Sequence, residues 1–233
     1  MSPTVLARAS GTIVVAVLAA SAVVPAAARA SLSCARSGAT IAANSETRVF
    51  RRGTVPSGET KGAALYYGCS RRSGHIRRLN LRGEFGIEHV TASRIRIAGH
   101  YVAYVDTAIS GAGTLPFATV VDVRSGHTVR NVQGSDAENA AIAIVGLVVT
   151  QRGSEAWIAR DCVRSATEPT TCAQPEMTEY RVTISDATTG TGQFGERVVA
   201  HSPAVAPHSL ALASNSHAIY WTEAGAARTA AIH

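Results

Sequence analysis

The sequence has no apolar run long enough to cross a membrane as a helix, which requires about 20 residues. The longest run, Gly11 to Val24, has 14 residues, and the longest later run, Ala140 to Val149, has ten. Both are too short, so we expect no transmembrane segment in the mature protein. A membrane anchor formed by the first run is the alternative.

The N-terminal run has the features of a secretion signal. Arg8 supplies a positive charge before it, Pro25 interrupts it, and Ala28-Arg29-Ala30 forms an A-x-A cleavage site. We therefore predict a signal peptide over residues 1–30 and a secreted or otherwise extracytoplasmic mature chain over residues 31–233. Alanine and glycine are abundant and Lys61 is the only lysine, which is typical of a bacterium with a GC-rich genome.

Motifs for catalysis and cofactor binding are also lacking. There is no G-x-S-x-G elbow and no C-x-x-C pair, and the eight histidines show no metal-ligand spacing. The one G-x-G-x-x-G, residues 190–195, is followed by strand-like residues and Pro203 rather than by the helix that a dinucleotide fold needs. We interpret it as a turn, and we expect no cofactor, no metal and no catalytic residue.

Two groups of residues nevertheless leave an enzyme open as the alternative. One is a set of neighbouring histidines, serines and an acid: His201, Ser202, His208, Ser209, His217 and Glu223. The other is the acids at strand ends and turns: Asp106, Asp122, Asp136 and Asp161. Because an Asp before a turn accepts backbone N–H groups, and Asp122 and Asp186 fall in equivalent turns, we favour structural roles. The alternative function is a secreted glycan hydrolase or lyase with paired carboxylates.

Four cysteines, an even number, suit disulfide formation in an oxidising compartment. Cys162 and Cys172 bracket a short loop, which predicts one disulfide and leaves Cys34 and Cys69 for a second. Zinc binding is the alternative for these cysteines. Lipid attachment is a further alternative for Cys34, although Leu32 lies one position too close for a good lipobox.

One pattern recurs four times along the chain. Alternating apolar residues, a turn with Gly, Asn or Ser, and a second apolar run are typical of a β-hairpin. The pattern covers residues 40–50, 95–105, 147–158 and 210–221. A second hairpin follows at residues 65–79 and 118–132, with a shared Ser-Gly-His turn, and more loosely at residues 180–194. In the fourth unit it shrinks to one strand at residues 225–232.

Two hairpins in about 50 residues make a unit the size of a propeller blade. We therefore predict an all-β fold of four-stranded, blade-like units, a small or partial β-propeller, with approximate units at residues 31–88, 89–138, 139–200 and 201–233. A β-sandwich is the alternative. Tyr104 and Trp157 are expected at equivalent buried positions. Because the last unit leaves a strand edge open, either residues 31–37 pair with residues 225–232 and close the ring, or a second molecule pairs there.

Two short phrases carry a family resemblance. Residues 120–126, Val-Val-Asp-Val-Arg-Ser-Gly, resemble the strand–turn phrase of WD40-like and TolB-like propellers. Residues 219–223, Ile-Tyr-Trp-Thr-Glu, resemble the YWTD signature with Glu in place of Asp. The resemblance extends loosely over residues 39–232. It implies the architecture of bacterial secreted β-propeller-repeat proteins and assigns no functional residue.

Charge is distributed unevenly along the mature chain. Residues 31–100 contain 12 basic and 4 acidic side chains, whereas residues 101–233 contain 8 and 12. The basic excess predicts a patch for a polyanion, such as a cell-wall phosphate polymer or an acidic polysaccharide, at Arg51, Arg52, Arg71, Arg72, Arg77, Arg78 and Arg82. A solvated surface and a contact with the acidic half of another protein copy are the alternatives. Nucleic acid is not an expected partner of an exported protein.

These observations favour a non-catalytic, extracytoplasmic binding or interaction module of β-propeller type. The sequence does not identify its ligand.

Overall fold

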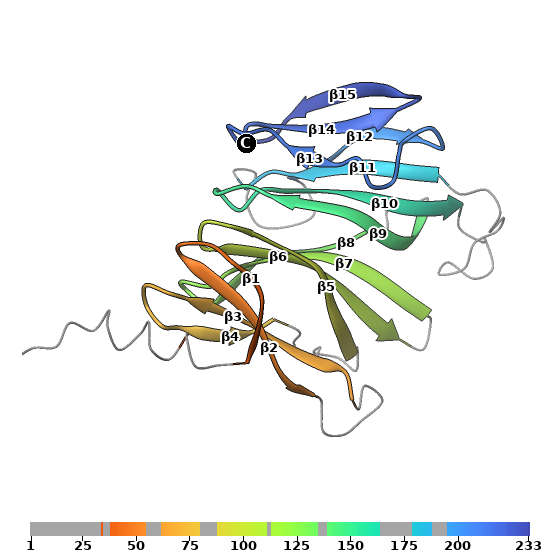
Figure 1. Cartoon of the computed structure of the whole chain (residues 1–233). Helices are drawn as coiled ribbons and strands as arrows, with labels where there is room; N and C mark the ends of the chain where they lie inside the picture. Colours follow the sequence, from red (N-terminus) through yellow and green to blue (C-terminus); the bar gives the residue numbers. More distant parts are fainter. Residues whose placement is uncertain are drawn as a thin grey trace, which may run out of the picture.

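The computed structural model describes residues 34, 38–54, 62–79, 88–110, 113–134, 139–163, 179–187 and 195–233. These residues form fifteen β-strands in four antiparallel sheets (Figure 1). In each sheet, every strand pairs with the next strand along the chain. The predicted all-β fold of blade-like units is therefore confirmed. The proposed signal peptide, Asp136 and Arg82 lie outside the described residues.

The sheets follow one another along the chain. The first contains β1 (Ala39–Ala43), β2 (Thr47–Thr54), β3 (Ala64–Ser70) and β4 (Ile76–Arg78). The second contains β5 (Glu88–Ala98), β6 (Tyr101–Ser110), β7 (Gly113–Asp122) and β8 (His127–Gln133). The third contains β9 (Asn139–Val149), β10 (Glu155–Val163), β11 (Glu179–Ser185) and β12 (Glu196–Ser202). The fourth contains β13 (Ala211–Leu212), β14 (Ala218–Glu223) and β15 (Ala226–Ala231).

The sheets stack face to face in chain order, from orange to blue in Figure 1. Apolar side chains fill each gap between neighbouring sheets, and adjacent residues of one strand face opposite gaps. Val102 of β6 packs toward the first sheet and Ala103 toward the third. This explains why the central strands are apolar at consecutive positions rather than at alternate ones. The stack is an open arc, with the first and fourth sheets at its two ends (Figure 1).

In the second, third and fourth sheets, an aromatic side chain on the second strand faces the preceding sheet. Tyr104 and Trp157 are each 1% exposed, and Trp221 is 5% exposed. They belong to the three successive gaps of the stack. Tyr104 and Trp157 therefore hold equivalent positions, as the repeat register predicts.

Phe50 occupies the corresponding place in the first sheet and packs against a disulfide instead of a sheet. The structure contains the expected bond between Cys34 and Cys69, with a Cα–Cα distance of 6.0 Å. Phe50 stacks on Tyr67 at 5.5 Å, and the Arg48 guanidinium lies 5.1 Å from the Phe50 ring centroid. Arg48 also donates a hydrogen bond to the Cys34 carbonyl. The disulfide thus covers the outer face of the stack's first sheet.

The expected ring closure concerns residues 31–37, of which all but Cys34 lie outside the described residues. Cys34 is the described residue of the segment 31–37, and it is buried on the first sheet rather than beside β15. Among the described residues, β15 pairs with β14 alone. The sulfur of Cys34 is engaged in the disulfide with Cys69. Cys162 is also disulfide-bonded, and its expected partner Cys172 lies outside the described residues.

The disulfide is consistent with an oxidising, extracytoplasmic compartment. In the part of the chain that the structure describes, no helix has the length and apolar character needed to span a membrane.

Candidate functional site

The basic residues of the first sheet fall into two groups. Arg71 and Arg72 lie in the β3–β4 turn, where the Arg71 amide donates a 2.7 Å hydrogen bond to the Glu46 carbonyl. Arg51 and Arg52 lie on β2, five and six residues beyond Glu46, which is about 17 Å along an extended strand. All four side chains are exposed. Their guanidinium groups form no ion pair or hydrogen bond with any described residue.

Arg77 and Arg78 on β4 have different surroundings. Both are half-buried, and Arg77 donates a 3.0 Å hydrogen bond to Thr128 Oγ1 on β8. Arg77 therefore links the first two sheets. The open basic surface, which we call the Arg surface, consists of Arg51, Arg52, Arg71 and Arg72.

Several arginines of the later sheets, in contrast, are neutralised by acids. The Nε atom of Arg181 lies 2.9 Å from Asp161 Oδ2, and Nε of Arg197 lies 3.4 Å from Asp186 Oδ2. Arg228 Nε lies 3.6 Å from Glu223 Oε2. The arginines of the Arg surface differ from these because their guanidinium groups form no ion pair with an acid among the described residues, although the backbone of Arg71 lies beside Glu46.

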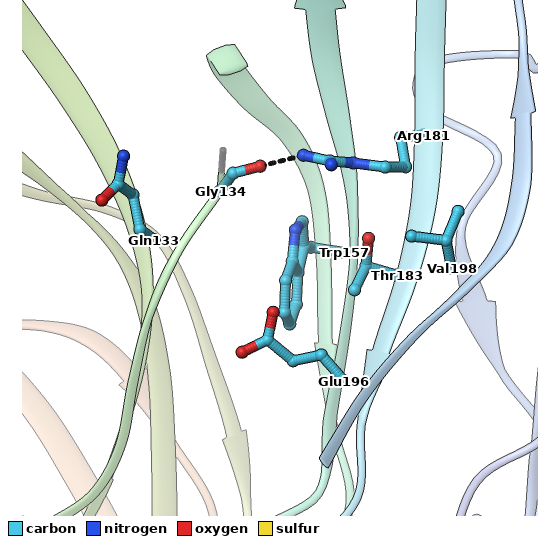
Figure 2. A pocket seen from close by; sticks show the side chains of 7 residues that line it. All are labelled: Gln133, Gly134, Trp157, Arg181, Thr183, Glu196 and Val198. Atoms are coloured by element: carbon cyan, nitrogen blue, oxygen red, sulfur yellow. Dashed lines mark hydrogen bonds between the residues drawn. The ribbon is translucent and has the colours of Figure 1, made fainter. Parts of the chain in front are cut away.

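A pocket of about 200 Å³ lies between the second and third sheets (Figure 2). Its residues come from the end of β8 and from β10, β11 and β12: Gln133, Gly134, Trp157, Arg181, Thr183, Glu196 and Val198. The Arg181 guanidinium donates a hydrogen bond to the Gly134 carbonyl across the two sheets. Glu196 is half-buried, and burial raises the pKa of its carboxyl although Arg181 and Arg130 lower it.

A carboxyl group is buried beside this pocket. Glu155 on β10 is 0% exposed, and neither of its carboxyl oxygens has a hydrogen-bond partner among the described residues. Burial raises the pKa of Glu155 to about 8, although Arg130 lowers it. Arg130 in turn donates a hydrogen bond to the Asp186 carbonyl. Glu155 is therefore held neutral at neutral pH inside the stack.

This burial predicts a pH-dependent stability. The unfolded chain releases the Glu155 proton near its ordinary pKa of about 4.3, whereas the folded chain retains it up to about pH 8. The stabilisation is complete below the unfolded pKa and is lost as the pH rises through the folded one. From pH 5 to pH 7 the free energy of unfolding should fall by about 2 kcal/mol from this group.

Urea titrations of the wild-type protein and of Glu155→Gln at pH 5, 6 and 7 check this prediction. The variant should gain stability relative to wild type as the pH rises. The exposed Glu46→Gln is the control for loss of one carboxylate. A constant difference between Glu155→Gln and wild type across this range would show that Glu155 is charged in the folded protein.

The acids singled out in the sequence do not come together. Asp122 Oδ1 accepts hydrogen bonds from the amides of Arg124 and Ser125, at 2.8 and 3.3 Å, as expected for an Asp before a turn. Asp186 instead accepts the His233 amide at 2.8 Å. Asp161 is paired with Arg181, and Asp106 is buried on β6.

The histidines are also dispersed over separate partners. His201 lies 3.1 Å from Glu179, and His208 Nδ1 lies 3.3 Å from the Val145 carbonyl. His75 lies against Gly126 of the equivalent turn in the second sheet, where a Cβ would come within 2.6 Å of the imidazole. Gly126 also has a φ of 77°, so packing and backbone both favour glycine there. In the described part of the chain, no three His, Cys, Asp or Glu residues are grouped to bind a metal.

The pocket and its polar residues were not anticipated from the sequence. A signal is present in the sequence of β11, where the polar residues Arg181 and Thr183 alternate with apolar residues. Polar residues at alternate positions ordinarily indicate a solvent-facing side of a strand. Here that side faces another sheet.

Comparison with known proteins adds no function. No family model matches the chain, and no curated protein matches it. Among solved structures it is similar to TolB from Acinetobacter baumannii, with 15% identity and a TM-score of 0.36 over 78% of this chain and 36% of that one. The chain thus spans about a third of the TolB chain. Its own four sheets define the class: an all-β protein of stacked, blade-like units.

Proposed function

We propose that this protein is an extracytoplasmic, non-catalytic binding module that holds a polyanionic polymer on the Arg surface. The observation that carries the proposal is the exposure of Arg51, Arg52, Arg71 and Arg72 without acidic partners. Arginine forms bidentate hydrogen bonds with phosphate, sulfate and carboxylate groups.

The spacing of the charges favours a polymer over a small anion. Arg71 lies beside Glu46, and Arg51 follows Glu46 by five residues, which is about 17 Å along an extended strand and farther than one phosphate or carboxylate group reaches. An extended chain with regularly spaced anionic groups contacts both pairs at once. An acidic polysaccharide and a phosphate polymer of the cell wall both have this chemistry.

Two further features support action outside the cytosol. The N-terminal residues have the pattern of a secretion signal, and the structure contains a buried disulfide. Both are expected of an exported protein that meets envelope polymers.

Charge reversal tests the proposal. The double variant Arg71→Glu/Arg72→Glu should elute from immobilised heparin at much lower salt than wild type, and adding Arg51→Glu/Arg52→Glu should abolish retention. The reason is that exposed charges act over about 10 Å at 0.1 M salt, so binding depends on local cations.

A matched control separates the Arg surface from net charge. Arg124→Glu/Arg152→Glu changes the net charge equally at exposed turns of the second and third sheets, and should remain near wild-type retention. If both double variants lost heparin retention equally, the retention would depend on net charge and not on the Arg surface. Retention of the quadruple variant at wild-type salt would refute the proposed polymer site.

A further inference from the structure

The pocket between the second and third sheets contains buried polar atoms that have no hydrogen-bond partner among the described residues. Trp157 is 1% exposed and Thr183 is 3% exposed. The indole Nε1 of Trp157 and the hydroxyl Oγ1 of Thr183 have no hydrogen-bond partner among the described residues. Leaving a buried polar group unsatisfied costs about 1–3 kcal/mol. Both side chains line the pocket (Figure 2). A molecule bound there can therefore form hydrogen bonds with the Trp157 indole N–H and with the Thr183 hydroxyl.

The charges around the pocket disfavour an ionic ligand. Arg181 Nε lies 2.9 Å from Asp161 Oδ2, and the guanidinium also donates to the Gly134 carbonyl, so Arg181 is already engaged within the protein. Glu196 lines the pocket and opposes an incoming anion. Arg181 and Arg130 lie near enough to Glu196 to lower the pKa of its carboxyl, and they oppose an incoming cation.

The hydrogen-bonding groups that line the pocket are suited to a ligand with hydroxyl groups. A hydroxyl accepts from the Trp157 indole N–H, exchanges a hydrogen bond with Thr183, and donates to the Glu196 carboxyl. Gln133 also lines the pocket, and its amide group points away from Trp157 in Figure 2. A ligand with several hydroxyls on a rigid ring satisfies these groups together at little entropic cost.

The size of the pocket limits the ligand to one ring. A volume of about 200 Å³ equals the share of roughly seven liquid water molecules. This is enough for one monosaccharide unit and too little for an oligosaccharide.

We propose that the pocket lined by Trp157, Thr183 and Glu196 binds a single neutral sugar residue, as a free monosaccharide or as one unit of a glycan. This site lies on the second and third sheets and does not depend on polymer binding at the Arg surface of the first sheet.

Calorimetric titration with glucose, galactose and N-acetylglucosamine tests the proposal. At least one sugar should bind the wild-type protein saturably, with a dissociation constant in the millimolar range or tighter. Thr183→Val, which keeps the side-chain shape, and Glu196→Gln, which removes the charge, should each weaken binding about 3- to 10-fold, the value of one hydrogen bond.

Thr119→Val is the matched control. Thr119 is also a buried threonine, 1% exposed, whose hydroxyl has no partner in the described structure, but it lies on β7 outside the pocket lining. This variant should bind the sugar as wild type does. Thermal unfolding of every variant checks that it is folded.

Three results would overturn the proposal. They are no heat of binding with any of the three sugars, sugar binding unchanged in both pocket variants, and binding of acetate, phosphate or glycine in place of the sugars. None of these results bears on heparin retention, which depends on the Arg surface, so the two proposals fail separately.

Discussion

Replacing Trp157 with alanine is expected to lower the free energy of unfolding by about 3–5 kcal/mol, the usual cost of truncating a buried aromatic side chain. Trp157 is among the largest fully buried side chains. It packs with Val105 and Val120 of the second sheet and Leu147 of its own sheet. Its removal opens a cavity between the second and third sheets. Urea denaturation followed by circular dichroism measures the loss as a lower midpoint.

Tyr220→Ala is the control for this substitution. Tyr220 is an aromatic residue on β14 but is 45% exposed, so its loss should change the midpoint little. If Trp157→Ala and Tyr220→Ala shifted the midpoint equally, Trp157 would not be in the core and the register of the third sheet would be wrong.

The double substitution Cys34→Ser/Cys69→Ser should lower the free energy of unfolding by about 3–4 kcal/mol. The two cysteines are 35 residues apart, and in the chain-entropy model a cross-link over that distance restricts the unfolded chain by this amount. The folded state loses contacts as well, because the disulfide covers Phe50. Changing both residues avoids an unpaired thiol. Thermal or urea unfolding under non-reducing conditions gives the difference.

Cys162→Ser/Cys172→Ser is the comparison for this variant. The expected Cys162–Cys172 loop is much shorter, so the same model gives a smaller loss. A loss for Cys34→Ser/Cys69→Ser that was negligible, or smaller than that for the second pair, would contradict the anchoring role of the first disulfide.

The sequence predicted much of the local structure. The first hairpins, β1–β2, β5–β6, β9–β10 and β13–β14, fall where alternating apolar residues flank a turn. Their turns are encoded by adjacent residues, as where Asn44 Oδ1 accepts the amides of Glu46 and Thr47. Local hydrogen bonds and a period of two residues are properties of a short segment, so a sequence pattern reveals them.

The sequence analysis singled out the exposed arginines but not the pocket. The exposed arginines Arg51, Arg52, Arg71 and Arg72 were found because charge excess is visible in composition. Arg77 was grouped with them, but in the structure it bonds to Thr128 on another sheet. The pocket was missed, because no pair of lining residues from β8 and β12 is near in sequence.

By itself, then, the sequence determined most of the strands, their order and the pairing of Cys34 with Cys69, because each depends on turn chemistry or on the spacing of few residues. The exception is β12 (Glu196–Ser202), which lies beyond the hairpin predicted at residues 180–194. Only the tertiary structure decided which sheet each strand face meets. In a stack of sheets both faces are buried, so the alternation on β11 separates two faces without telling which neighbour each one packs against. That choice placed Trp157, Thr183 and Glu196 around one pocket, buried Glu155, and left the arc open with Cys34 on its first sheet.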